Sequence, residues 1–260
     1  MKRSALFFIA LFFLHFASAQ NVGIGTPIPT AKLHVNGTLK VTDGTQGAGK
    51  ILTSDSSGLA SWKVYTPASD PYYARTSICC NPWMSKNLNV SAYQNGDPIP
   101  KVPDGPAWTA LTTGAYCYFN NDSTTYAAVY GKLYNWYAVN DPRGLAPEGW
   151  HVSTDFEWTN ASNCLGGDDV SGGFLKEVDT GHWNFPNTGA NDISSFTGRP
   201  AGYRDVNGIF GGMGHDGYFW SALESSAPNA WYRLLFYQND NLYRSELNKG
   251  FGFSVRCLKD

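Results

Sequence analysis

The sequence predicts an α+β protein in which small β-hairpins precede a larger domain of short mixed and antiparallel strands and two helices. Runs near the C-terminus, around Trp220, Trp231 and Phe253, alternate aromatic with polar side chains, as strands with one buried face do. Thr154 opens a sequence that is typical of a helix start. Aromatic residues make up 15% of the chain and glycine occurs 28 times, so many short strands joined by turns are expected.

Residues 1–19 read as a secretory signal peptide. Lys2 and Arg3 supply its charged start, residues 5–14 are apolar but too short to span a bilayer, and an Ala-Ser-Ala cleavage site ends at residue 19. A membrane anchor is the alternative, but no second apolar run follows. We therefore expect a secreted protein, extracellular or at the cell surface, with no membrane insertion.

Residues 20–66 are expected to form two small hairpins. Leu33 and Val35 alternate with polar residues before the turn dipeptide Asn36-Gly37, and the alternation resumes through residue 41. Residues 51–52 and 59–64 predict a second hairpin around a polar turn. Hairpins of this size cannot bury a core alone.

This N-terminal segment resembles the stalks of fibre proteins in its run VGIGT followed by AKLHVNG. Such segments gain a core by trimerising, so the resemblance implies a homotrimer held through residues 20–66. An extended leader packed on its own domain is the alternative. Residues 67–82, with Pro67 and Pro71, are then expected to be a linker.

Two helices are predicted in the larger domain, residues 83–260. Tyr130, Leu133, Tyr134 and Tyr137 recur at helical spacing, which predicts a helix over residues 127–139. Thr154 and Glu157 form a capping box, so a second helix should begin there and end at the glycine pair 166–167.

Three stretches carry a resemblance to a known family. Trp83-Met84 with Asn87-Leu88 and Val90 matches its opening, residues 149–158 match its GWHVPTDAEW stretch with Ser153 in place of proline, and the last strand holds Cys257. The chain resembles the Fibrobacter succinogenes major paralogous domain, a bacterial surface-protein module. That module is similar to C-type-lectin-like and formylglycine-generating-enzyme-like folds. The resemblance implies a C-type-lectin-like domain that binds or displays rather than catalyses.

The residues themselves give little support for catalysis or for nucleic-acid binding. His34, His151, His182 and His215 stand at no metal-site spacing. The formal charge of −2 becomes −4 once Lys2 and Arg3 leave with the signal, and no basic run appears. We expect no enzyme and no cofactor. The alternatives are an inactive formylglycine-generating-enzyme-like protein, for which Cys257 alone is too few thiols, and a purely structural fibre subunit.

The chain has five cysteines, and export would expose them to oxidants, so disulfides are expected. No CxxC or CxxH spacing indicates a metal site. The resemblance to lectin-like folds implies a bond between Cys164 and Cys257. A second bond is then expected between Cys117 and either Cys79 or Cys80, leaving one thiol free.

Ligand contact, with a carbohydrate or a protein, is predicted in the C-terminal half, on the loops 224–229 and 238–241. Aromatic rings next to Arg, Asn and Asp suit sugar or peptide recognition. Trp220 and Phe253 are expected in the core. Trp231, Arg233, Asn239 and Asn241 are expected on the surface. Calcium at 238–241 is an alternative to an ordinary turn there. The predicted ligand-binding residues are Glu224, Asn229, Trp231, Arg233, Asn239, Asp240 and Asn241.

Overall fold

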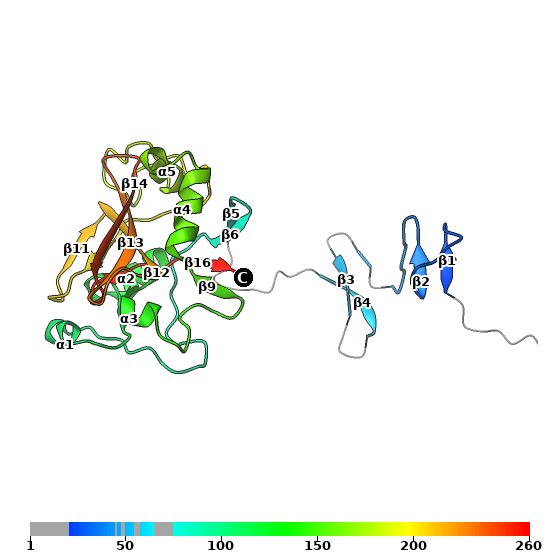
Figure 1. Ribbon diagram of the computed structural model, residues 1–260, viewed down its shortest axis with the longest axis horizontal. Helices are drawn as coiled ribbons and strands as arrows, with labels where there is room; N and C mark the ends of the chain where they lie inside the picture. The colour runs from blue at the N-terminus through cyan, green and yellow to red at the C-terminus, as the bar shows by residue number, and fades with distance from the viewer. Residues whose placement is uncertain (1–20, 45, 48–49, 55–57, 65–74) are drawn as a thin grey trace, which may run out of the picture. The chain divides into compact units, whose positions relative to one another are not determined.

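The computed structural model describes residues 21–44, 46–47, 50–54, 58–64 and 75–260 (Figure 1). The predicted signal peptide and the first part of the predicted linker, residues 67–74, lie outside these described residues. The chain divides into two units, Met1–Ala68 and Ser69–Asp260, and each is described by itself.

The N-terminal unit contains two small sheets. β3 (Lys50–Ser54) and β4 (Ala60–Val64) pair antiparallel, which confirms the second predicted hairpin. The first predicted hairpin is wrong, because β2 (Leu33–Val35) pairs in parallel with the upstream strand β1 (Val22–Ile24). That register aligns Val22 with Leu33 and Ile24 with Val35, so the apolar side chains of both strands share one face.

The second unit is built on two sheets. The larger runs in the order β14-β13-β12-β10-β15-β8-β7, with β11 also paired to β10, and α4 and α5 lie against its β12–β14 region (Figure 1). Its strands are β7 (Tyr116–Cys117), β8 (Leu133–Asn135), β10 (Ala201–Arg204), β11 (Phe210–Met213), β12 (Asp216–Glu224), β13 (Asn229–Phe236), β14 (Leu242–Asn248) and β15 (Gly252–Phe253).

The smaller sheet joins the two ends of this unit. Its order is β5-β6-β16-β9, with bounds Arg75–Ile78, Asn81–Met84, Cys257–Lys259 and Trp150–Val152. β16 pairs antiparallel with β6, placing Leu258 opposite Trp83. β5 and the start of β6 occupy residues 75–82, so this part of the predicted linker is a strand pair instead.

The predicted helix over residues 127–139 is wrong. The structure has α2 (Ser123–Tyr130), then β8, then α3 (Trp136–Val139). Gly131 ends α2 at φ +70°, where a side chain would be strained. Leu133 and Tyr134 then pair with β7 and β15, so tertiary pairing overrides the helical spacing of the apolar residues. Two short helical turns also precede α2: α1 (Gly105–Thr109) and η1 (Phe119–Asn121).

The capping box at Thr154 is confirmed. In α4 (Asp155–Cys164) the Thr154 hydroxyl accepts from the Glu157 amide, and the Glu157 carboxylate accepts from the Thr154 amide. A further helix, α5 (Asp168–Leu175), follows the glycine pair and was not predicted. Its own glycines obscured it, yet packing requires them: a Cβ on Gly172 would lie 2.2 Å from the Asn241 carbonyl oxygen.

The core is aromatic. Trp220 and Phe253 are fully buried, as predicted, with ring centroids 4.4 Å apart. In a second cluster, Trp158 of α4 packs against Trp83 and Phe196. These rings come from segments far apart in the sequence, so they hold the two sheets and the helix together.

Buried cations fasten loops to this core. Lys176 is fully buried, and its ammonium donates to the carbonyl oxygens of Thr188, Phe236 and Asn239. Arg204 and Arg256, each 1% exposed, donate to loop carbonyls in the same way. A loop crossing the interior needs partners for its carbonyl groups, and these side chains provide them.

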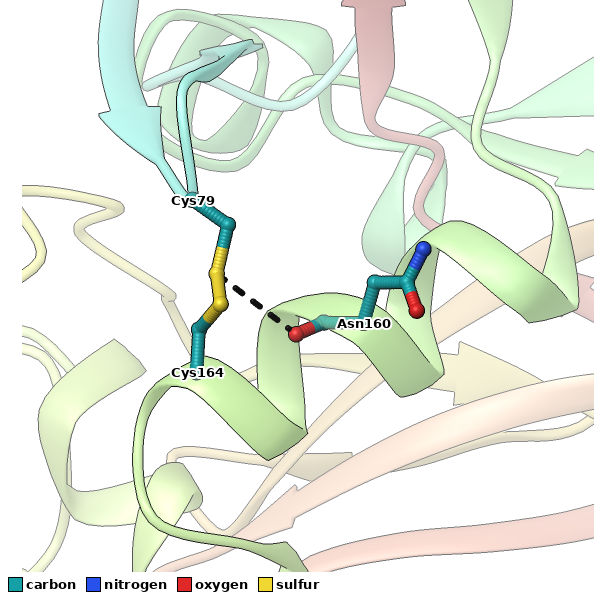
Figure 2. Close-up of a disulfide and its surroundings, with 3 residues drawn as sticks. All are labelled: Cys79, Asn160 and Cys164. Carbon is teal, nitrogen blue, oxygen red and sulfur yellow. Dashed lines mark hydrogen bonds between the residues drawn. A yellow bond between two sulfur atoms is a disulfide. The ribbon is translucent and has the colours of Figure 1, made fainter.

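The disulfide joins Cys79, in the turn between β5 and β6, to Cys164 at the end of α4 (Figure 2). The two Cα atoms are 6.0 Å apart, an ordinary spacing for a disulfide, and the Cys79 sulfur lies 3.7 Å from the carbonyl oxygen of Asn160. The predicted bond between Cys164 and Cys257 is wrong, and so is a second bond from Cys117.

The geometry explains these two corrections. Cys257 lies in β16, between β6 and β9, and its side chain is fully buried in the core. Cys117 is equally buried in a separate cluster. Burial raises the pKa of Cys117 to about 12 and raises that of Cys257 even more strongly, so both are protonated thiols at neutral pH. Cys80 is free and exposed.

Candidate functional site

The structure does not bring the predicted ligand-binding residues together. Glu224 and Asn229 flank the turn between β12 and β13, whereas residues 239–241 form the turn between β13 and β14. The whole of β13 separates them, roughly 25 Å at about 3.3 Å per residue. The two loops therefore lie at opposite ends of β13, which pairs with β12 and β14.

Structural contacts occupy the side chains at both ends. Glu224 pairs with the buried Lys249 at 3.0 Å. At the other end Asn239 donates to the Tyr243 hydroxyl at 2.8 Å, and Asn241 donates to Asp169 of α5 at 3.3 Å. The Asn239 side-chain oxygen accepts from the Asn241 amide, so it serves the turn. Asp240 packs against Gly189. Within the described residues, no cluster of three or more His, Cys, Asp or Glu side chains is placed to hold a metal ion.

The prediction that Arg233 lies on the surface is wrong, because its side chain is buried, with 1% exposed. It faces α4, where its guanidinium lies 2.9 Å from the Asp155 carboxylate. Arg244 makes a two-pronged contact with the same carboxylate and covers the Trp231 ring at 3.4 Å. Trp231 is thus half-buried beneath an arginine, which reduces the ring face left for a ligand.

A different surface combines an aromatic ring with uncommitted polar groups. We call it the aromatic pocket, a cavity of about 260 Å³ formed by α3, the loop after it and the segment before β7. Asn135, fully buried, positions these parts: its side-chain oxygen accepts from the amides of Ala115 and Ala138, and its amide nitrogen donates to the Thr113 carbonyl. The lining residues are Thr112, Thr113, Gly114, Trp136, Tyr137, Asn140, Asp141, Pro142 and Arg143.

One wall of the aromatic pocket is formed by a pair of opposite charges. The Arg143 guanidinium donates two hydrogen bonds to the Asp141 carboxylate, at 2.8 and 2.9 Å. It also stacks on the Tyr93 ring, 4.0 Å from the ring centroid. A hydrogen bond from Arg143 lowers the pKa of Asp141. Burial, reinforced by the Asp141 charge, raises the pKa of Tyr93 to about 12, so the phenol stays protonated. This wall therefore presents two charges that neutralise each other.

The other wall is available for binding. Thr112, Thr113, Tyr137 and Asn140 have no side-chain hydrogen-bond partner within the described residues. Hydroxyls and an amide beside a tyrosine ring can pair with several hydroxyl groups while the ring covers an apolar face. The sequence reasoning missed this site, although the run from Trp136-Tyr137 through Asn140, Asp141 and Arg143 shows the same aromatic and polar mixture as the C-terminal half.

One protein family matches the second unit of this chain. The model of the Fibrobacter succinogenes major domain matches residues 77–259, most of the chain. The chain belongs to that family. The major domain thus runs from β5 to the end of β16 and contains both sheets of the second unit. Neither the curated proteins nor the solved structures contain a match to this chain. In the described part of the chain, no helix has the length and apolar character needed to cross a membrane.

The major domain has a second, apolar cavity of about 310 Å³ near β9. Its lining is mostly buried aliphatic and aromatic side chains, with His151 and Thr154 among the polar exceptions. His151 is held between two carboxylates, with Nδ1 2.6 Å from Asp260 and Nε2 2.7 Å from Glu157. Burial lowers the pKa of His151, but the hydrogen bonds with both carboxylates outweigh it, so the pKa is raised.

This histidine predicts a pH-dependent stability of the major domain. Because the pKa of His151 is higher in the folded state, its stabilising effect is complete below the unfolded-state pKa of about 6.5 and is lost as pH rises through the folded-state pKa. The melting temperature of the native protein should exceed that of His151→Gln at about pH 5.5, and the difference should shrink by about pH 8.5. A difference that grows with pH would contradict this assignment.

Proposed function

We propose that this protein is a secreted bacterial surface protein whose major domain, of C-type-lectin-like fold, binds a carbohydrate and is not an enzyme. The aromatic pocket is the observation that carries the proposal. The predicted signal peptide supports export, and the mixture of short strands and helices supports the fold. A protein ligand is the alternative occupant.

The chemistry of the pocket favours a neutral sugar. Sugars carry many hydroxyl groups and one apolar face, which match the free hydroxyls, the Asn140 amide and the Tyr137 ring. Among the described residues of the lining, the charged side chains are Asp141 and Arg143, and they neutralise each other. A strongly charged ligand would find no unpaired counter-charge there.

The formylglycine-generating-enzyme-like alternative gains no support from the thiols. Such chemistry needs thiolates that a substrate can reach, whereas Cys117 and Cys257 are buried and protonated. Cys80 is the one exposed free thiol among the described residues. A single accessible thiol does not supply a two-cysteine centre.

A glycan array tests the carbohydrate proposal. The mature protein should bind neutral glycans. Adding a metal chelator should leave this binding unchanged, because the aromatic pocket binds the sugar without a metal ion. Tyr137→Ala and Asn140→Ala should each weaken binding about tenfold, because each removes a contact of about 1–1.5 kcal/mol. Their matched controls, Tyr243→Ala and Asn239→Ala, change the same residue types at the β13–β14 turn. Loss of affinity in the controls alone would place the site at that turn.

We also propose that the N-terminal unit self-associates, as a trimer. Val22, Ile24 and Leu33 are each 55% exposed and share the apolar face of the β1–β2 sheet with Val35. A two-stranded sheet with one apolar face needs a covering surface to be stable. A second and a third copy of the same segment would provide it.

Sedimentation analysis of the mature chain tests this association. The native protein should sediment as a trimer, and the double variant Ile24→Ser, Leu33→Ser as a monomer, since both changes place hydroxyls on the shared face. Leu223→Ser, at a residue 48% exposed in the major domain, is the matched control and should remain trimeric. A native chain that is monomeric at high concentration would refute the proposal.

A further inference from the structure

A further hollow, lined mostly by polar residues, shares no lining residue with the aromatic pocket, and we call it the basic cleft. Two adjoining cavities of about 110 and 200 Å³ share Lys86, Asn87 and Val129 in their walls. Four separate chain segments form them: the stretch after β6, the end of α2, the loop before β10 and the residue before β16. The remaining lining residues are Ser85, Asn89, Ala127, Ala128, Gly131, Thr197, Arg199 and Arg256.

The charges in the basic cleft do not balance. Lys86, Arg199 and Arg256 line it, whereas its described lining contains no carboxylate. Glu177 neutralises Arg199 from outside the lining at 3.0 Å. Asp192 is close enough to Arg256 to affect its titration, but Asp192 hydrogen-bonds to Thr197 instead. Lys86 is exposed and has no partner within the described residues.

Arg256 forms the floor of the cleft. Its guanidinium donates to the Asn87 side-chain oxygen and to the carbonyl oxygens of Met84 and Phe196, each at 2.7 Å, and to that of Thr197 at 3.1 Å. These bonds use four of the five N–H groups of a guanidinium, and one on Nη2 has no hydrogen-bond acceptor within the described residues. Burial and the nearby charge of Arg199 lower the pKa of Arg256 to about 9, as expected for a cation short of negative charge.

One acceptor in the cleft is also unused. The side-chain oxygen of Asn89 is buried and makes no hydrogen bond within the described residues, while its amide nitrogen donates to the Ala127 carbonyl. A buried acceptor without a donor is costly. A ligand that places an anionic group between Lys86 and Arg256 and a hydroxyl on Asn89 would satisfy both ends of the cleft.

We propose that the basic cleft is a second ligand site, which takes a compact oxyanion carried by a hydroxylated group: the carboxylate or sulfate of an acidic sugar. The cavities of about 110 and 200 Å³ adjoin, so the anionic group would occupy the smaller cavity and the sugar ring the larger one beside it. The site uses none of the aromatic-pocket residues, so it stands independently of the function proposed above.

Titration with three related sugars tests this site directly. Glucuronate and glucose 6-sulfate supply the two forms of oxyanion, and glucose is the neutral control. We expect glucuronate or glucose 6-sulfate to shift the NMR signals of the Asn87 and Asn89 side-chain amides, with glucose leaving them unchanged. The stronger of the two anions identifies the preferred group. Equal shifts with glucose, or none with either anion, would overturn the proposal.

Substitutions then separate this site from general charge effects. Lys86→Gln should weaken binding of the anionic sugar about fivefold, typical for one accessible ion pair, while the exposed position leaves the melting temperature unchanged. Lys259→Gln makes the same charge change on β16 outside the cleft and should have no effect, as should Tyr137→Ala in the aromatic pocket. An equal loss with Lys259→Gln, or unchanged binding with Lys86→Gln, would refute a specific site.

Discussion

Replacing Arg256 with methionine is expected to lower the free energy of unfolding of the major domain by about 4 kcal/mol. The side chain is 1% exposed, and its four hydrogen bonds hold the stretch after β6, the loop at 196–197 and the last strand. Methionine fills much of the same space but leaves these buried acceptors without donors. Urea unfolding followed by tryptophan fluorescence measures the change.

Two further variants test whether hydrogen bonding is the cause. Arg75→Met removes an exposed arginine of β5 that has no side-chain partner within the described residues, so its effect should stay below about 0.5 kcal/mol. Arg256→Lys keeps the charge but loses the planar guanidinium group. Its loss in the free energy of unfolding should lie between those of Arg75→Met and Arg256→Met. If Arg256→Met were as stable as the native protein, the loops would not depend on this guanidinium.

Removing the disulfide is expected to have an effect of similar size. Cys79 and Cys164 are 85 residues apart in the sequence, and closing a loop of that length stabilises the folded state by about 4–5 kcal/mol in the chain-entropy model. Cys79→Ser should therefore lower the free energy of unfolding by about 4 kcal/mol. Reductant added to the native protein should produce the same loss.

The neighbouring cysteine provides the control for that experiment. Cys80→Ser changes a free, exposed thiol in the same turn and should leave the stability within about 0.5 kcal/mol of the native protein. Mass mapping of unreduced peptides should find Cys79 linked to Cys164 (Figure 2). Iodoacetamide should label Cys80. A peptide linked through Cys164 and Cys257, the bond that the resemblance to lectin-like folds implies, would contradict the structure.

The sequence predicted features that depend on neighbouring residues. The capping box at Thr154 works through groups three residues apart, and Trp220 and Phe253 follow the alternation of their own strands, so local pattern was enough. Residues 127–139 show where it failed. The apolar residues stand at helical spacing, but Gly131 ends the first helix there. The residues that follow form a strand because β7 and β15 pair with them, and a second short helix comes after that strand.

The candidate sites depended on distant parts of the chain, which spacing does not reveal. Glu224 and Asn239 look alike in sequence because both sit in polar turns between aromatic strands, yet β13 holds those turns apart. Arg233 looks exposed by residue type, but the Asp155 carboxylate on α4 allows it to be buried. The disulfide was mispaired for the same reason, since only the folded sheet shows that β16 lies between two other strands.

The pairing of β16 with β6 has a consequence for how the major domain can be inserted into other proteins or duplicated. Because its first and last strands are two places apart in one sheet, the ends of the domain lie within roughly 10 Å across that sheet. A gene segment encoding such a unit can be inserted into a loop of another protein, or duplicated head to tail, without stretching the host chain. Copies could then diverge in the aromatic pocket and the basic cleft while the paired ends stay the same.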